Sequence, residues 1–139
     1  MLCSWKQFWL SAVLVSLLAT ACRRDDYEML EGKWQLKTVE QGSVVTAVDT
    51  VWYNFQSASM FMYLIYKADT QEYTHCYGIR TQPDAAILDL ELMSWGTDAQ
   101  DFIRQTDWDE TTRTFTVEML KSKRLVLTSG GKKYVFIKF

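Results

Sequence analysis

The fold of this chain is decided by residues 31–40, which read Glu-Gly-Lys-Trp-Gln-Leu-Lys-Thr-Val-Glu. In this segment the apolar side chains of Trp34 and Leu36 alternate with the polar side chains of Lys33, Gln35 and Lys37. Successive side chains of a β-strand point to opposite faces, so an alternation with a period of two predicts a strand with one solvated face. We therefore expect residues 31–40 to form a strand with Trp34 in the core.

Seven further segments continue this pattern as short strands separated by turns. They are residues 48–56, 60–67, 72–80, 87–93, 113–120, 124–128 and 133–139. The strand at 72–80 is expected to end at the turn Gln82-Pro83-Asp84, and Gly130-Gly131 is expected to close a hairpin between the last two strands. The eight strands predict an all-β, antiparallel, up-and-down barrel, because closure of such a meander removes its unpaired edges.

The stretch around residues 97–106 interrupts the alternation. It fits a short helix capped by Thr97 or Asp98, or an irregular strand, and the helix is favoured.

A barrel of eight strands leaves an interior that is either filled by side chains or holds one small ligand.

Composition limits the chain to a single globular domain. The 139 residues include one proline and six glycines, and 48% of them are apolar. Fifteen basic and seventeen acidic side chains give a formal net charge of −2, so overall charge gives no reason to expect a nucleic-acid partner.

Residues 1–21 have the features of a signal peptide. The uncharged apolar run from Phe8 to Ala21 is shorter than the roughly 20 residues of a spanning helix. Residues 19–22, Ala-Thr-Ala-Cys, resemble the lipobox of bacterial lipoproteins, in which the cysteine thiol is acylated and becomes the mature N-terminus. The resemblance implies a lipid anchor at Cys22 and a place in the cell envelope, at the outer membrane. An ordinary secretory signal that stops at a cysteine is the alternative.

Residues 22–29 are expected to form a flexible charged tether. Asp25 and Asp26 resemble the surface-export signal of Bacteroidetes-type lipoproteins, although Arg23 and Arg24 depart from it, and a solvated linker is the alternative. The protein is therefore expected on either the periplasmic face of the outer membrane or the cell surface. After processing, Cys76 is left as the only thiol, which excludes an intrachain disulfide.

The chain from residue 30 to residue 139 resembles the lipocalin-like lipoproteins of Bacteroidetes. Gly32-Lys33-Trp34 is similar to the G-x-W motif at the first strand of lipocalins and fatty-acid-binding proteins, and residues 115–120 and 134–139 are similar to the last strands of the family. The resemblance implies a lipocalin-like barrel domain over residues 30–139. It also implies that Trp34 closes one end of the barrel and has a structural role.

The sequence predicts no catalytic site, metal site or cofactor. His75 and Cys76 are neighbours in a strand, so their side chains point to opposite faces and cannot act as a nucleophile and its base. Asp89 and Glu91 are explained as the solvated face of a strand. The chain has no CxxC, HxxxH or HExxH spacing, no P-loop, no GxGxxG and no GxSxG motif. We therefore expect a protein that is not an enzyme.

Two classes of binding function remain open. A carrier of a small apolar or amphipathic molecule would contact it with the inward residues of its strands, expected to be Tyr53, Phe55, Met62, Leu64, Tyr77, Leu90 and Phe115. A barrel with a filled core would instead present a surface to a protein or glycan partner. The candidates for that surface are the doubly apolar strand 60–67 and the segment 119–139, which carries six bases and no acid.

Overall fold

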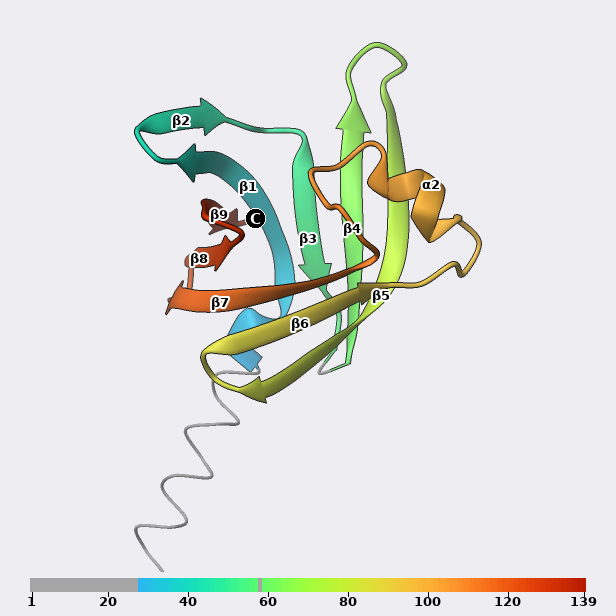
Figure 1. Cartoon of the computed structure of the whole chain (residues 1–139). Coiled ribbons are helices and arrows are strands. Elements are labelled where there is room, and N and C mark those ends of the chain that lie inside the picture. The colour runs from blue at the N-terminus through green and yellow to red at the C-terminus, as the bar shows by residue number, and fades with distance from the viewer. Residues whose placement is uncertain (1–27, 58) are drawn as a thin grey trace, which may run out of the picture.

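The computed structural model describes residues 28–57 and 59–139 (Figure 1). The predicted signal peptide at 1–21, the predicted lipid anchor Cys22 and most of the predicted tether lie outside the described residues. Within the described ranges, no helix has the length and hydropathy needed to span a bilayer.

The described chain forms a closed antiparallel β-barrel. Its strands are β1 (Gly32–Gln41), β2 (Val44–Ala47), β3 (Val51–Phe55), β4 (Met60–Lys67), β5 (Glu72–Asp84), β6 (Ile87–Leu92), β7 (Thr112–Leu120), β8 (Arg124–Ser129) and β9 (Lys132–Lys138). They lie in the order β2-β1-β3-β4-β5-β6-β7-β8-β9, and β1 also pairs with β9. This last pairing closes eight strands into a ring, which confirms the predicted all-β, up-and-down, eight-stranded barrel.

Strand β1 has two partners along one of its edges. Its first half pairs with β3, and its second half pairs with β2 through the register Thr38↔Ala47 to Gln41↔Val44. The sequence did not predict β2, because all four of its side chains are exposed and no buried face imposes an alternation on them. Strand β2 therefore lies outside the ring of eight and extends the wall at one end of the barrel (Figure 1).

Strand β5 is longer than the sequence predicted. It continues through Gln82-Pro83-Asp84, where a turn was expected, and the chain turns only at residues 85–86. The pairing with β6 shifts register between Thr81 and Asp84. Proline has no N–H for a ladder hydrogen bond, and such an irregularity is where a strand tolerates it. The predicted end of this strand at Arg80 was therefore wrong.

The interruption near 97–106 contains the helix α2 (Ala99–Ile103), so the helical alternative is confirmed. Its N-cap is Asp98, whose carboxylate accepts a 3.0 Å hydrogen bond from the backbone N–H of Asp101. The helix is held in place because Ala99, Phe102 and Ile103 are buried against the barrel.

The hydrophobic core closes one end of the barrel around Trp34. This side chain is fully buried, as predicted, and its Nε1 donates a 2.8 Å hydrogen bond to the carbonyl oxygen of Leu30. The hairpin between β8 and β9 also forms as predicted, with Gly130 and Gly131 at φ 58° and 76°. The Trp34 end of the barrel is thus sealed, and the opposite end is the one to which Gln41 and the β8–β9 turn belong.

Candidate functional site

The structure places only some of the expected ligand-contacting residues inside the barrel. Four of the seven have their side chains buried in the core: Tyr53, Phe55, Leu90 and Phe115. The inward placement of Met62, Leu64 and Tyr77 was wrong, because all three lie on the outer face. The residues that point inward are Phe61 and Tyr63 on β4 and, on β5, the small Cys76 and Gly78 followed by Arg80 and Gln82.

Met62, Leu64 and Tyr77 lie outside, and not inside as expected, for a steric reason. Strand β4 is apolar on both faces, so its pattern did not identify the inner one. The interior takes the rings of Phe61 and Tyr63, and the facing strand β5 then has room only for small residues at its two adjoining inner positions. Gly78 pairs directly with Phe61, and a Cβ atom at Gly78 would lie 2.4 Å from the Phe61 ring. Tyr77 is consequently on the outside.

Aromatic side chains fill the middle of the barrel around Tyr53. The centroid of its ring lies 4.8 Å from that of Tyr63 and 5.0 Å from that of Phe136. Rings of Phe55, Phe61, Trp108 and Phe115 surround it at 6.3–6.5 Å. The Nε1 of Trp108 donates a 3.1 Å hydrogen bond to the Tyr53 hydroxyl. Packed rings therefore occupy the barrel interior at this level of its axis.

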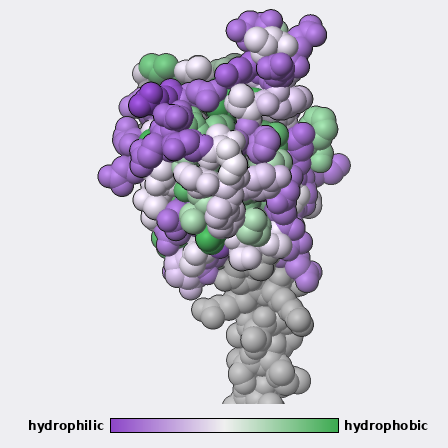
Figure 2. Space-filling model, turned by 90° about the vertical axis from the view of Figure 1, so that its right-hand side faces the viewer, coloured by the Kyte–Doolittle hydropathy of each residue, from purple (hydrophilic) through white to green (hydrophobic). Residues whose placement is uncertain are grey.

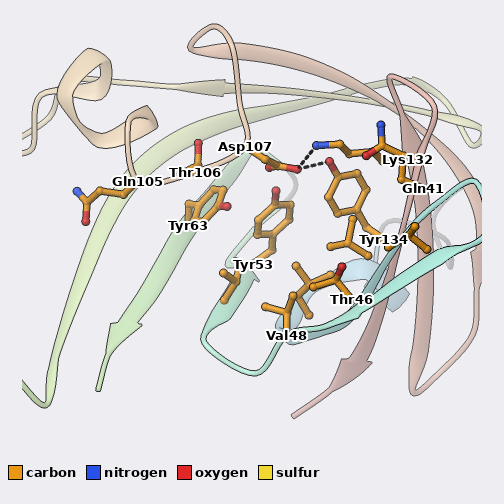
Figure 3. Close-up of a pocket in the computed structure, with 14 residues that line it drawn as sticks. Gln41, Thr46, Val48, Tyr53, Tyr63, Gln105, Thr106, Asp107, Lys132 and Tyr134 are labelled. Atoms are coloured by element: carbon orange, nitrogen blue, oxygen red, sulfur yellow. Dashed lines mark hydrogen bonds and ion pairs between the residues drawn. The ribbon is translucent and has the colours of Figure 1, made fainter. Parts of the chain in front are cut away.

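Above this aromatic layer a pocket of about 330 Å³ lies at the Gln41 end of the barrel (Figure 3). Among the expected ligand contacts, Tyr53 lines it, while Phe55, Leu90 and Phe115 do not. The full lining is Leu36, Val39, Gln41, Val44, Thr46, Val48, Val51, Tyr53, Tyr63, Gln105, Thr106, Asp107, Lys132 and Tyr134.

The pocket has two chemically different walls. The aliphatic wall comes from β1, β2, the chain that leads into β3 and the first residue of β3, and its members are Leu36, Val39, Val44, Val48 and Val51. The polar wall comes from the segment after α2 and from β9, with Asp107 and Lys132 at its centre (Figure 3). A site with this division suits a molecule that has an apolar body and a polar end.

The polar wall is organised around the carboxylate of Asp107. Its Oδ1 lies 3.2 Å from Nη1 of Arg113, and its Oδ2 lies 3.5 Å from Nζ of Lys132. The Tyr134 hydroxyl donates a hydrogen bond to Oδ2 and accepts one of 2.6 Å from Nη2 of Arg113. Arg113 also donates from Nε to Ser129 Oγ at 3.1 Å. Asp107 thus joins the segment after α2 to β7 and β9.

The tyrosines of the pocket are hydrogen-bond donors at neutral pH. Burial raises the pKa of Tyr53 and that of Tyr63, and the negative charge of Asp107 raises both further. Burial also raises the pKa of Tyr134, and its hydrogen bond to Asp107 acts in the same direction. None of these hydroxyls is set up to serve as a base near pH 7.

The groups that first suggest chemistry in the sequence lie apart from this pocket. Cys76 is buried and His75 is exposed, so the predicted opposite orientation of this pair is confirmed. Asp89 and Glu91 point outward between buried leucines, as expected. In the described part of the chain, no group of three His, Cys, Asp or Glu side chains is placed to hold a metal ion.

The outer face of β3, β4 and β5 forms a second notable surface. It carries the misassigned Met62, Leu64 and Tyr77, and also Trp52 and Tyr73. The rings of Trp52 and Tyr73 lie 5.8 Å apart, and the Tyr73 side chain is 52% exposed. Figure 2 shows the side of the molecule where β5 lies, with pale and green atoms between hydrophilic margins.

The six bases of segment 119–139 do not form one patch, because Lys132 and Lys133 lie at the pocket end and Lys123 and Lys138 at the other.

The sequence did not identify the polar wall. Asp107 follows α2 in an irregular segment, and Lys132 begins β9 directly after a turn, so neither belongs to an alternation that predicts which way its side chain points. They meet because β7, β8 and β9 pair in sequence, which brings the segment before β7 close to the start of β9.

Comparison with known proteins agrees with this architecture. A family model described as "Lipocalin-like domain" matches residues 16–139. A lipocalin-like protein from Bacteroides uniformis ATCC 8492 is 29% identical in sequence, with a TM-score of 0.70 over 80% of this chain and 99% of that one. A protein from Bacteroides eggerthii DSM 20697 is 30% identical, with a TM-score of 0.66 over 78% of this chain and 98% of that one. No curated protein matches significantly. The closed eight-stranded barrel and the family match together show that this chain belongs to the lipocalin-like domain family.

Proposed function

We propose that this protein is a lipid-anchored protein of the cell envelope whose barrel binds a small apolar or amphipathic molecule without catalysing a reaction. The lipocalin-like barrel is a binding type of fold, and the observation that carries the proposal is the two-walled pocket of about 330 Å³. That volume is at the lower end of the roughly 300–1,000 Å³ typical of small-molecule sites. The ligand is accordingly a compact molecule or a single short chain.

The start of the described chain and the pocket lie at opposite ends of the barrel. Lys138 and Trp34 hold residues 29 and 30 at the sealed end, through bonds to the carbonyl oxygens of Met29 and Leu30. The pocket is at the opposite end, beside Gln41. If Cys22 carries the lipid, the anchored segment joins the barrel at its sealed end, and the pocket lies at the end remote from this junction.

The test is native mass spectrometry on protein without residues 1–21, expressed in its own cells, to detect a co-purifying molecule. A matched pair of variants assigns any molecule to the pocket. Val44 and Val45 are adjacent in β2 and are similarly exposed, at 63% and 60%, but only Val44 is among the residues that line the pocket. We expect Val44→Asp to lose the co-purifying mass and Val45→Asp to keep it.

Two results would contradict the carrier function. One is the absence of any bound mass under several mild purification conditions. The other is an equal effect of both aspartate variants, since that would place the molecule somewhere other than the pocket.

A second candidate function is supported by the outer face of β3, β4 and β5. Protein interfaces are enriched in aromatic residues and methionine and are depleted in Lys, Glu and Asp. Met62, Tyr73 and Tyr77 give this face that composition, while Trp52 lies beneath it, only 7% exposed and with its ring centroid 5.3 Å from Nζ of Lys33. These observations favour a protein partner over a glycan.

Site-specific photo-cross-linking in cells tests this second function. A cross-linker at position 77 is compared with one at position 116, where Thr116 is exposed on β7. A discrete cross-linked protein at 77 and none at 116 is the expected result. Equal cross-linking at both positions, or none at either, would reject the outer face as a partner surface.

A further inference from the structure

The pocket lining carries one acidic and one basic side chain, Asp107 and Lys132, and a second cation, Arg113, lies beside Asp107 outside the lining. Asp107 and Arg113 neutralise each other, since Oδ1 of Asp107 lies 3.2 Å from Nη1 of Arg113. The three nitrogens of Arg113 are all engaged, with Ser129, Asp107 and Tyr134. Lys132 is therefore left as an excess positive charge on the pocket wall, and its side chain is 28% exposed.

Lys132 also has unused hydrogen-bonding capacity. An ammonium group has three N–H donors. Within the described residues, the only side-chain partner of the Lys132 ammonium is Asp107. The Nζ–Oδ2 distance of this ion pair is 3.5 Å, which is longer than a close charge-assisted hydrogen bond. The Asp107 carboxylate already accepts from Tyr134 and Arg113. Lys132 can thus turn towards a ligand while Asp107 keeps its other partners.

The remaining polar groups of the lining are the tyrosines and the side chains of Gln41, Thr46, Gln105 and Thr106, and the last four can both donate and accept hydrogen bonds. The buried Tyr53 and Tyr63 are protonated phenols, and Asp107 is the one carboxylate in the lining. That carboxylate is shared by three donors. A ligand end that accepts hydrogen bonds and carries negative charge complements such a wall, whereas an ammonium end would meet Lys132 at close range.

We propose that the pocket selects amphiphiles with an anionic head group, which pairs with Lys132 while the apolar chain lies along the aliphatic wall of β1, β2 and the approach to β3. This inference rests on the proposed carrier function and names the class of ligand. Carboxylates and phosphate monoesters share the required chemistry.

Isothermal titration calorimetry tests the proposal with four ligands of one chain length, each below its micellar concentration. They are decanoate, decyl phosphate, decan-1-ol and decylamine, titrated into protein that lacks residues 1–21 at pH 7. At least one of the two anions is expected to bind about ten-fold or more tightly than the alcohol, and the amine more weakly than the alcohol. The stronger of the two anions identifies the source of the charge.

The neighbouring lysine provides the matched control. Lys132→Met should abolish most of the preference for the anion over the alcohol, and Lys132→Glu should reverse the order of anion and amine. Lys133 is the next residue of β9, pairs with Glu118 at 3.8 Å and does not line the pocket, so Lys133→Met should leave the preference unchanged. Urea unfolding of each variant checks that the barrel is intact.

The outcomes separate this inference from the carrier function. If alcohol, amine and anions bind equally well, and Val44→Asp weakens them all, the pocket is a carrier site and the charge selection is wrong. If none of the four binds, the carrier function itself fails for chain amphiphiles, and the selection fails with it. Loss of the anion preference in Lys133→Met would also overturn the role of Lys132.

Discussion

Phe61 on β4 and Gly78 on β5 are directly paired across the sheet, with the Phe61 ring lying over the glycine. A Cβ atom at Gly78 would lie 2.4 Å from the Phe61 ring and 2.3 Å from the carbonyl oxygen of Glu91. The glycine is thus required by the space that the ring and the neighbouring strand occupy. It fixes which face of β4 points inward.

Replacement of this glycine is expected to destabilise the barrel. The carbonyl of Glu91 belongs to the backbone of β6, so Gly78→Ala forces the strands apart as well as moving the ring. Overpacking of this kind costs about 1–3 kcal/mol in the free energy of unfolding, measurable by urea denaturation. The cost should be smaller in a Phe61→Leu background, because one of the two clashes is then relieved. Equal midpoints for Gly78→Ala and wild type would show that the pairing is not as tight as described.

Removal of the Trp34 side chain should have a larger effect. The residue is fully buried and bonded to the Leu30 carbonyl, so Trp34→Ala leaves a cavity and an unpaired acceptor. The expected loss is about 3–5 kcal/mol, which lowers the melting temperature by about ten degrees or more. Trp34→Phe keeps most of the packing, so its melting temperature should lie between those of wild type and Trp34→Ala. A melting temperature of Trp34→Ala equal to that of wild type would mean that this end of the barrel is not sealed by Trp34.

Stability should decline in alkaline solution because of the buried tyrosines. Burial raises the pKa of Tyr53, Tyr63 and Tyr134 in the folded state, whereas an unfolded tyrosine ionises near pH 10. The folded chain then holds protons that the unfolded chain has released, so this stability is full below about pH 10 and is lost as pH rises above it.

Urea unfolding at pH 8, 9, 10 and 11 measures this decline, with tyrosinate absorbance recorded in parallel. The slope above pH 10 should be reduced in Tyr63→Phe, which removes one of the three groups. Constant stability up to pH 11, with every tyrosine titrating in the folded state, would contradict the burial of these hydroxyls.

Lipid attachment at Cys22 is a proposal that labelling can test directly. Cys22→Ser should abolish incorporation of a radiolabelled or clickable fatty acid and leave the precursor unprocessed or the protein soluble, because the serine hydroxyl does not accept the lipid. Cys3→Ser, which changes the cysteine inside the predicted signal peptide, should label like wild type. Unchanged labelling of Cys22→Ser would remove both the anchor and the placement of the pocket relative to it.

The sequence by itself determined the class of the fold. The alternation at 31–40 and in the seven later segments predicted all eight strands of the ring, and the interruption near 97–106 predicted α2. The period of two is a local property of strands that bury one face, so it can be read without knowledge of their partners. It placed Trp34 in the core for the same reason. It could not reveal β2, whose side chains are all exposed.

Only the tertiary structure decided which face of β4 and β5 points inward and where the pocket lies. A strand that is apolar on both faces has two equivalent patterns, and the choice between them depends on the volume left by the rings of the other strands. Phe61 and Tyr63 take that volume, which sends Met62, Leu64 and Tyr77 outside. The polar wall is also a product of the tertiary structure, because Asp107 and Lys132 lie 25 residues apart and meet across the pairing of β7, β8 and β9.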